Sequence, residues 1–187
     1  MTDYPNWFNY TAKANFEKFL TKKDGMLCLQ LGVYTGDASL WMLENLGAIE
    51  LIDVDTWQGS DEDEHKSMDF SDVEKAYDEK FSNRTFKNKM TTVEYLTHQL
   101  SCDRCDRRSF DFIYIDADHT TVGVLMDAEL SWGLLKSNGI MAFDDYTWGA
   151  DMPPHLTPTL GIDLFLERHD GEYETLAVNE QVWIKKK

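Results

Sequence analysis

The sequence of 187 residues predicts one α/β domain built on a doubly wound, mostly parallel sheet. Short apolar runs of the kind found in buried parallel strands alternate with segments of helical periodicity along the chain. Glycines and acidic residues follow several of these runs, at places where a strand would turn into a helix. Near the C-terminus, two runs alternate between apolar and polar residues, as an antiparallel hairpin does. We therefore expect a Rossmann-like sheet of seven strands with a C-terminal antiparallel hairpin.

The first half of the chain is expected to supply three strands and the helices between them. Apolar residues at helical spacing, closed by a glycine, predict an N-terminal helical segment. Asp37 is a suitable N-cap for the next helix. The expected elements are, in order, the helical segment 1–25, a strand at 26–31, a turn at 32–36, a helix from Asp37 to Gly47 that buries Leu40, Leu43 and Leu46, a strand at 49–54, an acidic insertion loop at 56–70, a helix at 72–82 that buries Val73, Tyr77 and Phe81, and a weak strand from Lys89 to Val93.

The second half of the chain is expected to supply two more parallel strands and the hairpin. The strongest strand signal is the apolar run from Phe110 to Ile115. Asn138 and Gly139 mark a turn into the fifth strand. The expected elements are, in order, a short helix ending near Leu100, a polar loop at 101–109, a strand at 110–115, a helix at 121–135 that buries Val122, Leu125, Ala128, Trp132 and Leu135, a strand at 140–143, a loop at 146–158, a helix at 159–169, and strands at 173–178 and 181–184.

The charge and composition exclude several classes of protein. With 18 Lys and Arg against 34 Asp and Glu, the net charge is −16, which repels nucleic-acid backbones and anionic membranes. No apolar run approaches the roughly 20 residues that cross a bilayer. The first residues lack the regions of a signal peptide. Three cysteines cannot all pair within the chain, so we expect a reducing, cytoplasmic setting.

Glycine and acidic residues at two strand ends indicate a nucleoside ligand. Gly32 and Gly36 follow the first strand and let backbone amides approach an anionic group at a helix start. Asp53 stands 21 residues after Gly32, the spacing at which a second-strand carboxylate receives ribose hydroxyls; alternatively, it only caps its strand. Tyr34 replaces the middle glycine of a dinucleotide fingerprint. This favours a nucleoside with a small carboxylate, such as S-adenosylmethionine, over NAD.

Three segments resemble motifs of class I S-adenosylmethionine-dependent methyltransferases. They are residues 29–37 (LQLGVYTGD), 110–119 (FDFIYIDADH) and 134–146 (LLKSNGIMAFDDY). Within that class the chain resembles the macrocin O-methyltransferase-like subgroup, which is related to cation-dependent O-methyltransferases. The resemblance runs from about residue 26 to the C-terminus. It implies an enzyme with a single methyltransferase domain over residues 1–187.

The resemblance also implies roles for individual residues. The methionine part of the cofactor would lie along the first turn, the ribose at Asp53, and the adenine near Thr91 and Thr92. The family usually has an acidic residue where this chain has Gln30, which weakens one polar contact. The cofactor-binding residues implied in this way are Gln30, Gly32, Tyr34, Gly36, Asp53, Thr92 and Asp116.

Carboxylates at the ends of neighbouring parallel strands, about 4.8 Å apart, can share a cation. The resemblance implies that Asp116, Asp144 and Asp145 hold it, and all-oxygen ligands favour Mg²⁺, Mn²⁺ or Ca²⁺ over zinc. Alternatively, Asp144 and Asp145 bond loop amides and Asp116 only lies near the cofactor. Asp118 and His119 are candidate catalytic bases. Asp118 would equally serve as the N-cap of the next helix, and His119 as a loop hydrogen-bonding group.

Together these observations predict a methyltransferase that uses S-adenosylmethionine and a divalent cation to methylate a small hydroxylated acceptor, such as a sugar, polyol or phenol. Three alternatives remain open: a non-catalytic module that binds S-adenosylmethionine or S-adenosylhomocysteine, a metal-independent N-methyltransferase, and a hydroxylase-like function. Cys102 and Cys105, with His98 upstream, have partial zinc spacing, but an ordinary polar loop is the more economical interpretation. Neither nucleic acid nor a membrane is an expected partner.

Overall fold

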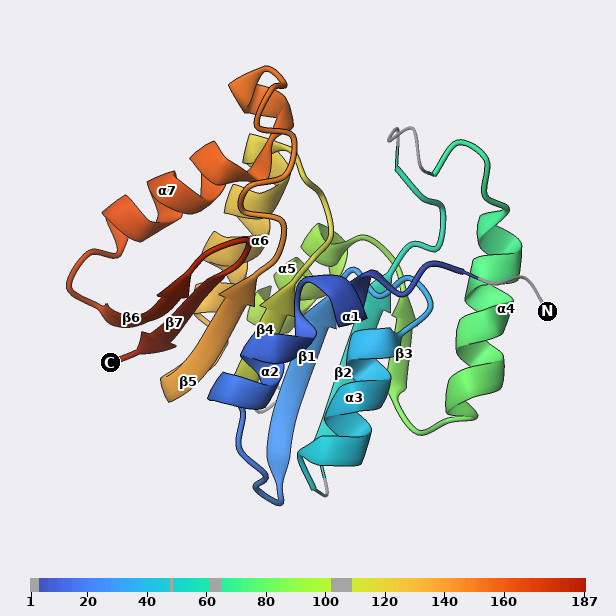
Figure 1. Ribbon diagram of the computed structural model, residues 1–187. Coiled ribbons are helices and arrows are strands. Elements are labelled where there is room, and N and C mark those ends of the chain that lie inside the picture. Colours follow the sequence, from blue (N-terminus) through green and yellow to red (C-terminus); the bar gives the residue numbers. More distant parts are fainter. Residues whose placement is uncertain (1–3, 48, 61–64, 102–108) are drawn as a thin grey trace.

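The computed structural model describes residues 4–47, 49–60, 65–101 and 109–187 (Figure 1). Helices and strands alternate along most of the chain, as the sequence predicts. The elements are α1 (Trp7–Tyr10), α2 (Lys13–Phe19), β1 (Met26–Leu31), α3 (Asp37–Asn45), β2 (Ile49–Asp55), α4 (Phe70–Phe81), β3 (Phe86–Lys89), α5 (Thr92–Ser101), β4 (Phe110–Ile115), α6 (Thr121–Trp132), β5 (Leu135–Phe143), the 3₁₀ turn η1 (Pro154–Leu156), α7 (Pro158–Arg168), β6 (Tyr173–Val178) and β7 (Val182–Lys186).

The strands form one seven-stranded sheet in the order β3-β2-β1-β4-β5-β7-β6. The first five strands are parallel, and β7 is antiparallel to both β5 and β6. This confirms the predicted doubly wound sheet with its C-terminal hairpin. The chain order reverses between β1 and β4, and ligands of such sheets bind beyond the carboxyl ends of the strands at this reversal.

The two faces of the sheet bury alternate residues of the same strands, because successive side chains of a strand point to opposite faces. Cys28 and Phe112 pack with α2 and α3 on one face. Leu29 and Ile113, their immediate neighbours, pack with α5, α6 and α7 on the other. Figure 1 shows α2 and α3 in front of the sheet and α5 and α6 behind it. Helices on both faces leave the two ends of the parallel strands as the places where a site can form.

The helix α4 forms a smaller apolar cluster beside the main core. Val73, Tyr77 and Phe81, the three residues predicted to be buried, are at most 1% exposed. They pack with Val33, from the turn after β1, and with Trp57, from the segment after β2. The helix α4 is therefore attached to the turns at the carboxyl ends of β1 and β2.

The segment predicted as an exposed acidic loop, residues 56–70, is described in part, since residues 61–64 lie outside the described residues. Within the described part, Trp57 is only 3% exposed. Its indole N–H donates to the carbonyl oxygen of Tyr34 at 3.0 Å. The start of this segment is thus anchored in the apolar cluster of α4, contrary to the expectation of an exposed loop there.

The N-cap of α3 differs from the prediction. Gly36, with a left-handed φ of 80°, is the N-cap, and Asp37 is the first helical residue. The Asp37 carboxylate instead pairs with the ammonium of Lys80 at 2.6 Å. Asp37 still favours the start of the helix, because negative charge in the first turn interacts well with the helix dipole.

Two predicted helical faces are correct in part, since Leu46 at the end of α3 and Ala128 and Trp132 of α6 are buried as predicted. In α3, Met42 is fully buried, whereas the predicted Leu40 and Leu43 are only partly buried. In α6, Val122 is 63% exposed and Val124 takes a buried place. In both helices several apolar residues lie close together in the sequence, so a small rotation exchanges one buried residue for another.

Two strand boundaries also differ from the prediction. The edge strand β3 begins three residues before the expected start at Lys89, with Phe86 paired to Ile52 of β2. The strand β5 begins at Leu135 and passes through Asn138, which has a left-handed φ of 64° where a turn was expected. The pairing of β5 with β4 shifts register near its start.

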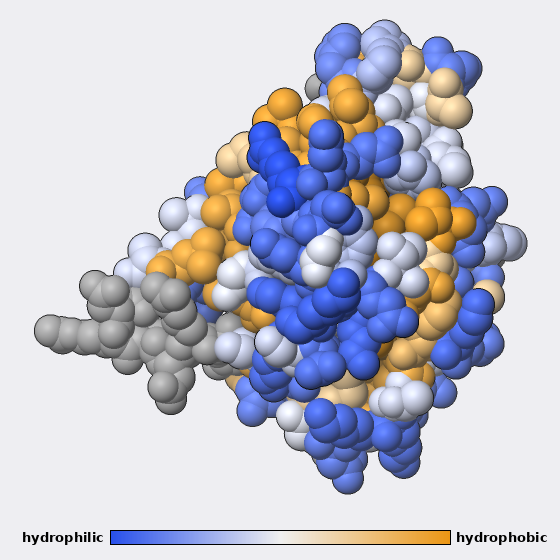
Figure 2. All heavy atoms as spheres, turned by 90° about the vertical axis from the view of Figure 1, so that its left-hand side faces the viewer, coloured by the Kyte–Doolittle hydropathy of each residue, from blue (hydrophilic) through white to orange (hydrophobic). Residues whose placement is uncertain are grey.

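None of the helices in the described part of the chain is long and apolar enough to cross a membrane. The face that carries α7 and the C-terminal hairpin is covered largely by hydrophilic side chains, with apolar side chains between them (Figure 2). This surface agrees with the content of charged residues, which is 28% of the sequence.

Candidate functional site

The carboxyl ends of β1, β2, β4 and β5 meet at one edge of the sheet, at the top of Figure 1. Gly32, the first residue after β1, lies against the chain that leaves β4. A Cβ on Gly32 would be 1.8 Å from the carbonyl oxygen of Asp116, and its φ of 78° is left-handed. Only glycine fits both conditions. The turn after β1 is therefore in direct contact with the start of the loop that carries Asp116.

Asp55, the last residue of β2, holds this turn from the other side. Its Oδ2 accepts the backbone N–H groups of Val33 at 2.7 Å and Tyr34 at 2.9 Å. Its Oδ1 accepts the backbone N–H of Trp57 at 2.7 Å. Sequence reasoning missed Asp55 because the strand was expected to end one residue earlier. The carboxylate that holds the turn after β1 is therefore that of Asp55.

The structure places Asp53 inside the protein. Its side chain is fully buried; its Oδ1 lies 2.9 Å from the hydroxyl oxygen of Ser39, and its Oδ2 accepts a hydrogen bond from Tyr77 at 2.6 Å. Burial raises the pKa of Asp53 to about 6. Asp53 lies two residues, roughly 7 Å, below the end of its strand. The predicted contact of Asp53 with ribose hydroxyls does not fit this position.

Gln30 is a second predicted cofactor residue that lies in the interior. Its side-chain N–H donates to the carbonyl oxygen of Gly32 at 3.0 Å. Its side-chain oxygen accepts a hydrogen bond from Ser39 at 2.7 Å. Gln30 therefore supports the turn after β1 from below and connects it, through Ser39, to Asp53.

Two more predicted cofactor residues have partners within the fold. A Cβ on Gly36 would be 2.3 Å from the ring of Phe81, so the glycine allows α4 to pack against the turn. The hydroxyl of Thr92 donates to Asp127 of α6 at 2.6 Å. Burial raises the pKa of Asp127 to about 7. Gly36 and Thr92 thus join elements of the fold in this structure.

Tyr34 presents its ring at the surface of the turn. The ring is half-buried, with its centroid 4.7 Å from that of Trp7 of α1 and 6.4 Å from that of His65. Its hydroxyl donates to the sulfur of Met68 at 3.5 Å. The N-terminal segment and the segment after β2 therefore meet at Tyr34, and their rings form an aromatic wall beside the turn.

A cavity of about 770 Å³ opens beside the carboxyl ends of β2 and β3. Cavities of this size commonly bind small molecules. Thr56 and Thr91 are among its lining residues, so it includes the place where adenine is expected. His98 also lines it, whereas Cys102 and Cys105, the rest of the partial zinc pattern, lie outside the described residues.

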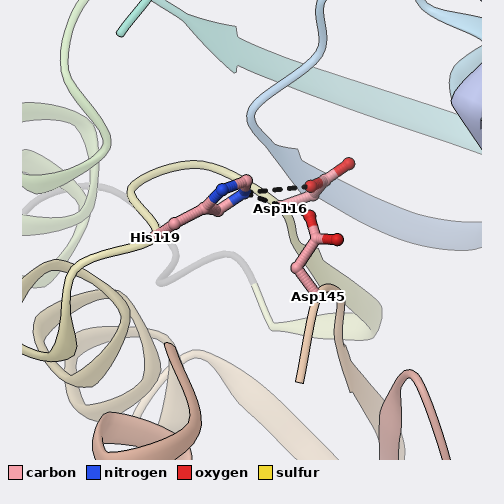
Figure 3. Close-up of side chains that lie close together, drawn as sticks. All are labelled: Asp116, His119 and Asp145. Carbon is pink, nitrogen blue, oxygen red and sulfur yellow. Dashed lines mark ion pairs between the residues drawn. The ribbon is translucent and has the colours of Figure 1, made fainter. Parts of the chain in front are cut away.

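Asp116, His119 and Asp145 point toward one another beyond the ends of β4 and β5 (Figure 3). The Nε2 atom of His119 lies 3.1 Å from Oδ2 of Asp145 and 3.8 Å from Oδ1 of Asp116. All three ligand atoms lie within 4.8 Å of one another. The ring of Trp148 lies 4.9 Å from that of His119. Two carboxylates and an imidazole in this arrangement can hold a divalent cation.

The carboxylates of this edge repel one another. Burial, followed by the negative charge of Asp144, raises the pKa of Asp116 well above its usual value. Burial, followed by the charge of Asp145, raises the pKa of Asp144 to about 6. A nearby cation would lower both values, because it stabilises the ionised form of each carboxylate. The charge of the edge therefore fits a cation site.

Asp144 itself is turned inward, contrary to its predicted place as a direct ligand. Its Oδ2 accepts the hydroxyl hydrogen of Tyr114. Its Oδ1 accepts the side-chain N–H of Gln181 at 3.0 Å and the backbone N–H of Asp145 at 2.9 Å. The structure thus brings His119, rather than Asp144, together with Asp116 and Asp145. Asp144 contributes negative charge behind the cluster.

The two predicted bases lie in the loop between β4 and α6 and face different ways. Asp118 is exposed, and its Oδ1 accepts the backbone N–H of Thr120 at 2.8 Å. Thr120 is the N-cap of α6, since its hydroxyl accepts the N–H of Gly123 at 3.0 Å. His119 instead turns toward Asp145. Of the two, His119 is the residue that the structure places among the acidic groups.

Comparison with known protein sequences gives one match. Residues 29–146 match the sequence model of a family described as a methyltransferase domain. No curated protein sequence matches the chain.

Several solved structures share the fold. An O-methyltransferase from Bacillus cereus in complex with SAH has a TM-score of 0.61 at 14% identity, over 100% of this chain and 93% of that one. A putative rRNA-methylase from Clostridium thermocellum has a TM-score of 0.65 at 13% identity, over 100% and 98%. The MycE methyltransferase of the mycinamycin biosynthetic pathway, in complex with Mg, SAH and mycinamycin VI, has a TM-score of 0.60 at 15% identity, over 99% and 50%.

Proposed function

The chain belongs to the methyltransferase-domain family and is an S-adenosylmethionine-dependent methyltransferase, and from this premise we propose that it methylates a hydroxyl oxygen of a small molecule with the help of a divalent cation. The observation that carries the proposal is the convergence of Asp116, His119 and Asp145 at the ends of two neighbouring strands. We further propose that the chain belongs with the macrocin O-methyltransferase-like subgroup that its motifs resemble.

The cation would be held by Asp116, His119 and Asp145. When bound, it lowers the pKa of an acceptor hydroxyl and orients the resulting oxyanion. The raised pKa values of Asp116 and Asp144 support such a site, because uncompensated negative charge is already crowded there. The Mg complex of the MycE methyltransferase, which has a similar fold, is consistent with this assignment.

The cofactor would lie along the edge from the turn after β1 to the cavity beside β3. Gly32 keeps the turn packed against the chain at Asp116, and the ring of Tyr34 would form a wall of the cofactor site at the same turn. Asp55 would be the acid that receives the ribose, since one of its four acceptor positions is left over after three backbone N–H groups. The adenine would enter the cavity near Thr56 and Thr91. Asp53 and Gln30 would act only by supporting the turn.

Methyl transfer needs little from the protein beyond alignment of the acceptor oxygen with the methyl carbon. With His119 as a cation ligand rather than the predicted base, the hydroxyl proton would pass to the carboxylate oxygen of Asp145 that does not hold the cation. Trp148 beside His119 would limit the access of water to the reacting groups. A nucleic-acid acceptor is disfavoured by the net charge of −16, even though one structure of similar fold is a putative rRNA-methylase.

The test begins with calorimetric titration of the protein with S-adenosylmethionine and S-adenosylhomocysteine. Small hydroxylated acceptors are then assayed for methyl transfer with Mg²⁺, with Mn²⁺ and with excess EDTA. We expect cofactor binding, and turnover that stops in EDTA and returns with added cation. Turnover that persists in EDTA would favour a metal-independent N- or O-methyltransferase. Cofactor binding without transfer to any acceptor would favour a non-catalytic module.

A further inference from the structure

A polar network, buried except for Asn179 at the surface, connects the N-terminal helix α2 to the cation site through the C-terminal hairpin. It crosses one face of the sheet, where most neighbouring side chains are apolar. Its members are Asn15, Tyr114, Asp144, Asn179, Gln181 and Trp183. The chemistry of the proposed function uses only the charge of Asp144, so the role of the other members is open.

Gln181 stands at the centre of this network and is fully buried. Its side-chain oxygen accepts the side-chain N–H groups of Asn15 and Trp183, each at 2.8 Å. An amide oxygen that receives two donors fixes which way the amide is turned, so its nitrogen faces Asp144. That nitrogen donates to Oδ1 of Asp144 at 3.0 Å.

Tyr114 holds the second oxygen of the same carboxylate. It is 1% exposed and donates its hydroxyl hydrogen to Oδ2 of Asp144. With Tyr114 on one oxygen and Gln181 on the other, Asp144 has a single orientation. Its Oδ1 also accepts the backbone N–H of Asp145.

Asp145 has a left-handed φ of 56°, which a residue with a side chain adopts only at a conformational cost. The hydrogen bond from its N–H to the fixed carboxylate of Asp144 stabilises this conformation. The same conformation directs the side chain of Asp145 outward to His119, where Oδ2 and Nε2 are 3.1 Å apart (Figure 3).

We propose that Tyr114 and Gln181 are positioning residues for the cation site: they fix Asp144, and Asp144 in turn fixes the backbone turn that presents Asp145. The proposal rests on the cation site of the proposed function. A polar network in an apolar layer is stabilising only if every polar group has a hydrogen-bond partner. Apolar side chains of similar size would fill the same space, so packing alone does not require these polar groups. Groups that orient metal ligands in this way tune metal affinity.

The test compares the Mn²⁺ affinity of the wild type with that of Tyr114→Phe, by calorimetry and by the electron paramagnetic resonance of free Mn²⁺, without cofactor or acceptor. Tyr114→Phe removes one hydroxyl and keeps the ring, so the fold should persist. We expect Mn²⁺ to bind at least about 10-fold more weakly, the usual effect of losing a group that orients a metal ligand. Tyr173→Phe is the matched control, because the hydroxyl of Tyr173 in β6 donates to the carbonyl oxygen of Leu166 in α7 and takes no part in the network.

Thermal unfolding supplies a second readout that a purely structural role would not move. A ligand raises the melting temperature according to its affinity for the folded state. The increase caused by Mn²⁺ should be smaller in Tyr114→Phe than in the wild type and in Tyr173→Phe, whatever the metal-free melting temperatures are. Gln181→Met should behave like Tyr114→Phe in this assay.

Equal Mn²⁺ affinity and an equal Mn²⁺-dependent increase in the wild type and Tyr114→Phe would overturn the positioning role while leaving the cation site in place. Failure of the wild type itself to bind Mn²⁺ would overturn the cation site, and the positioning role with it. The two failures are distinguishable, since the second is seen in the wild type alone.

Discussion

Asp53 lies in a network that contains one hydrogen too few when the carboxyl group is ionised. Ser39 has a single hydroxyl hydrogen, yet its oxygen lies 2.7 Å from the side-chain oxygen of Gln30 and 2.9 Å from Oδ1 of Asp53. A protonated Asp53 would donate to Ser39, which would then donate to Gln30. This arrangement satisfies every acceptor and agrees with a pKa raised to about 6.

Asp53→Asn should therefore change how stability depends on pH. The folded-state pKa of Asp53 lies above its usual value of 3.8, so its contribution is fully present below about pH 4 and is lost as the pH rises through 6. A shift of this size corresponds to about 3 kcal/mol. Urea unfolding from pH 4 to pH 7 should show the wild type losing stability relative to Asp53→Asn by up to that amount. Parallel curves for the two proteins would contradict the protonated network.

Asp55 and Asp53 make a matched pair for locating the ribose site. Asp55→Asn should weaken binding of S-adenosylhomocysteine at least about 10-fold, because hydrogen bonds to a charged group contribute about 1.5–3 kcal/mol. Asp53→Asn should change the affinity much less, since its side chain is fully buried among Ser39 and Tyr77. Calorimetric titration of both variants checks this. A larger loss of affinity in Asp53→Asn than in Asp55→Asn would instead indicate that the ribose binds at Asp53, as the sequence predicts.

The sequence predicts that an acid of the second strand serves the site, but not which one. Asp53 and Asp55 are two residues apart and point to the same side of the strand. Only the position of the strand end decides which of them is buried, and that position depends on the pairing of β2 with β1 and β3. The same limit applies to Asp144 and Asp145, because the partners of Asp144 come from β4 and the hairpin.

At the scale of elements, the turn after β1 depends on contact with the chain leaving β4. Gly32→Ala places a Cβ 1.8 Å from a backbone oxygen that has little freedom to move, in addition to the strain of a left-handed φ. Gly25→Ala has nearly the same φ, 77°, but its Cβ meets no atom of the described residues within 4 Å. Left-handed strain alone is about 1–2 kcal/mol.

Denaturant unfolding should therefore give a loss of about 1–2 kcal/mol for Gly25→Ala and a clearly larger loss for Gly32→Ala. Gly32→Ala should also weaken binding of S-adenosylhomocysteine, because relief of the clash moves the turn. Equal losses of stability would show that the contact between the two turns is loose, and would weaken the case that it shapes the cofactor site.

The elements that the sequence predicts well are those whose burial pattern is local. The strands β1, β2 and β4 are apolar runs in which most residues are buried. The edge strand β3 is different: Phe86 is 53% exposed, and the strand exists through its pairing with β2 rather than through a pattern of its own. A prediction from periodicity therefore places this strand too late in the sequence, toward the apolar residues that follow β3.

At the scale of the whole molecule, a net charge of −16 opposes the compact state by self-repulsion. Salt screens this repulsion, with a Debye length of about 10 Å at 0.1 M. Sodium chloride should therefore raise the melting temperature gradually, without saturating at low concentration. A bound divalent cation acts differently, because it stabilises the folded state by mass action at one place.

The melting temperature should accordingly rise more with MgCl₂ than with NaCl at equal ionic strength, and the extra rise should follow a single-site binding curve. Asp145→Asn should remove the extra rise and leave the response to NaCl. It should also raise the melting temperature without Mg²⁺, because Asp145 raises the pKa values of both Asp116 and Asp144 through its charge. These two effects have opposite signs, so general destabilisation of the variant would not produce them together. Identical responses of the wild type to the two salts would mean that its acidic edge attracts cations without binding one.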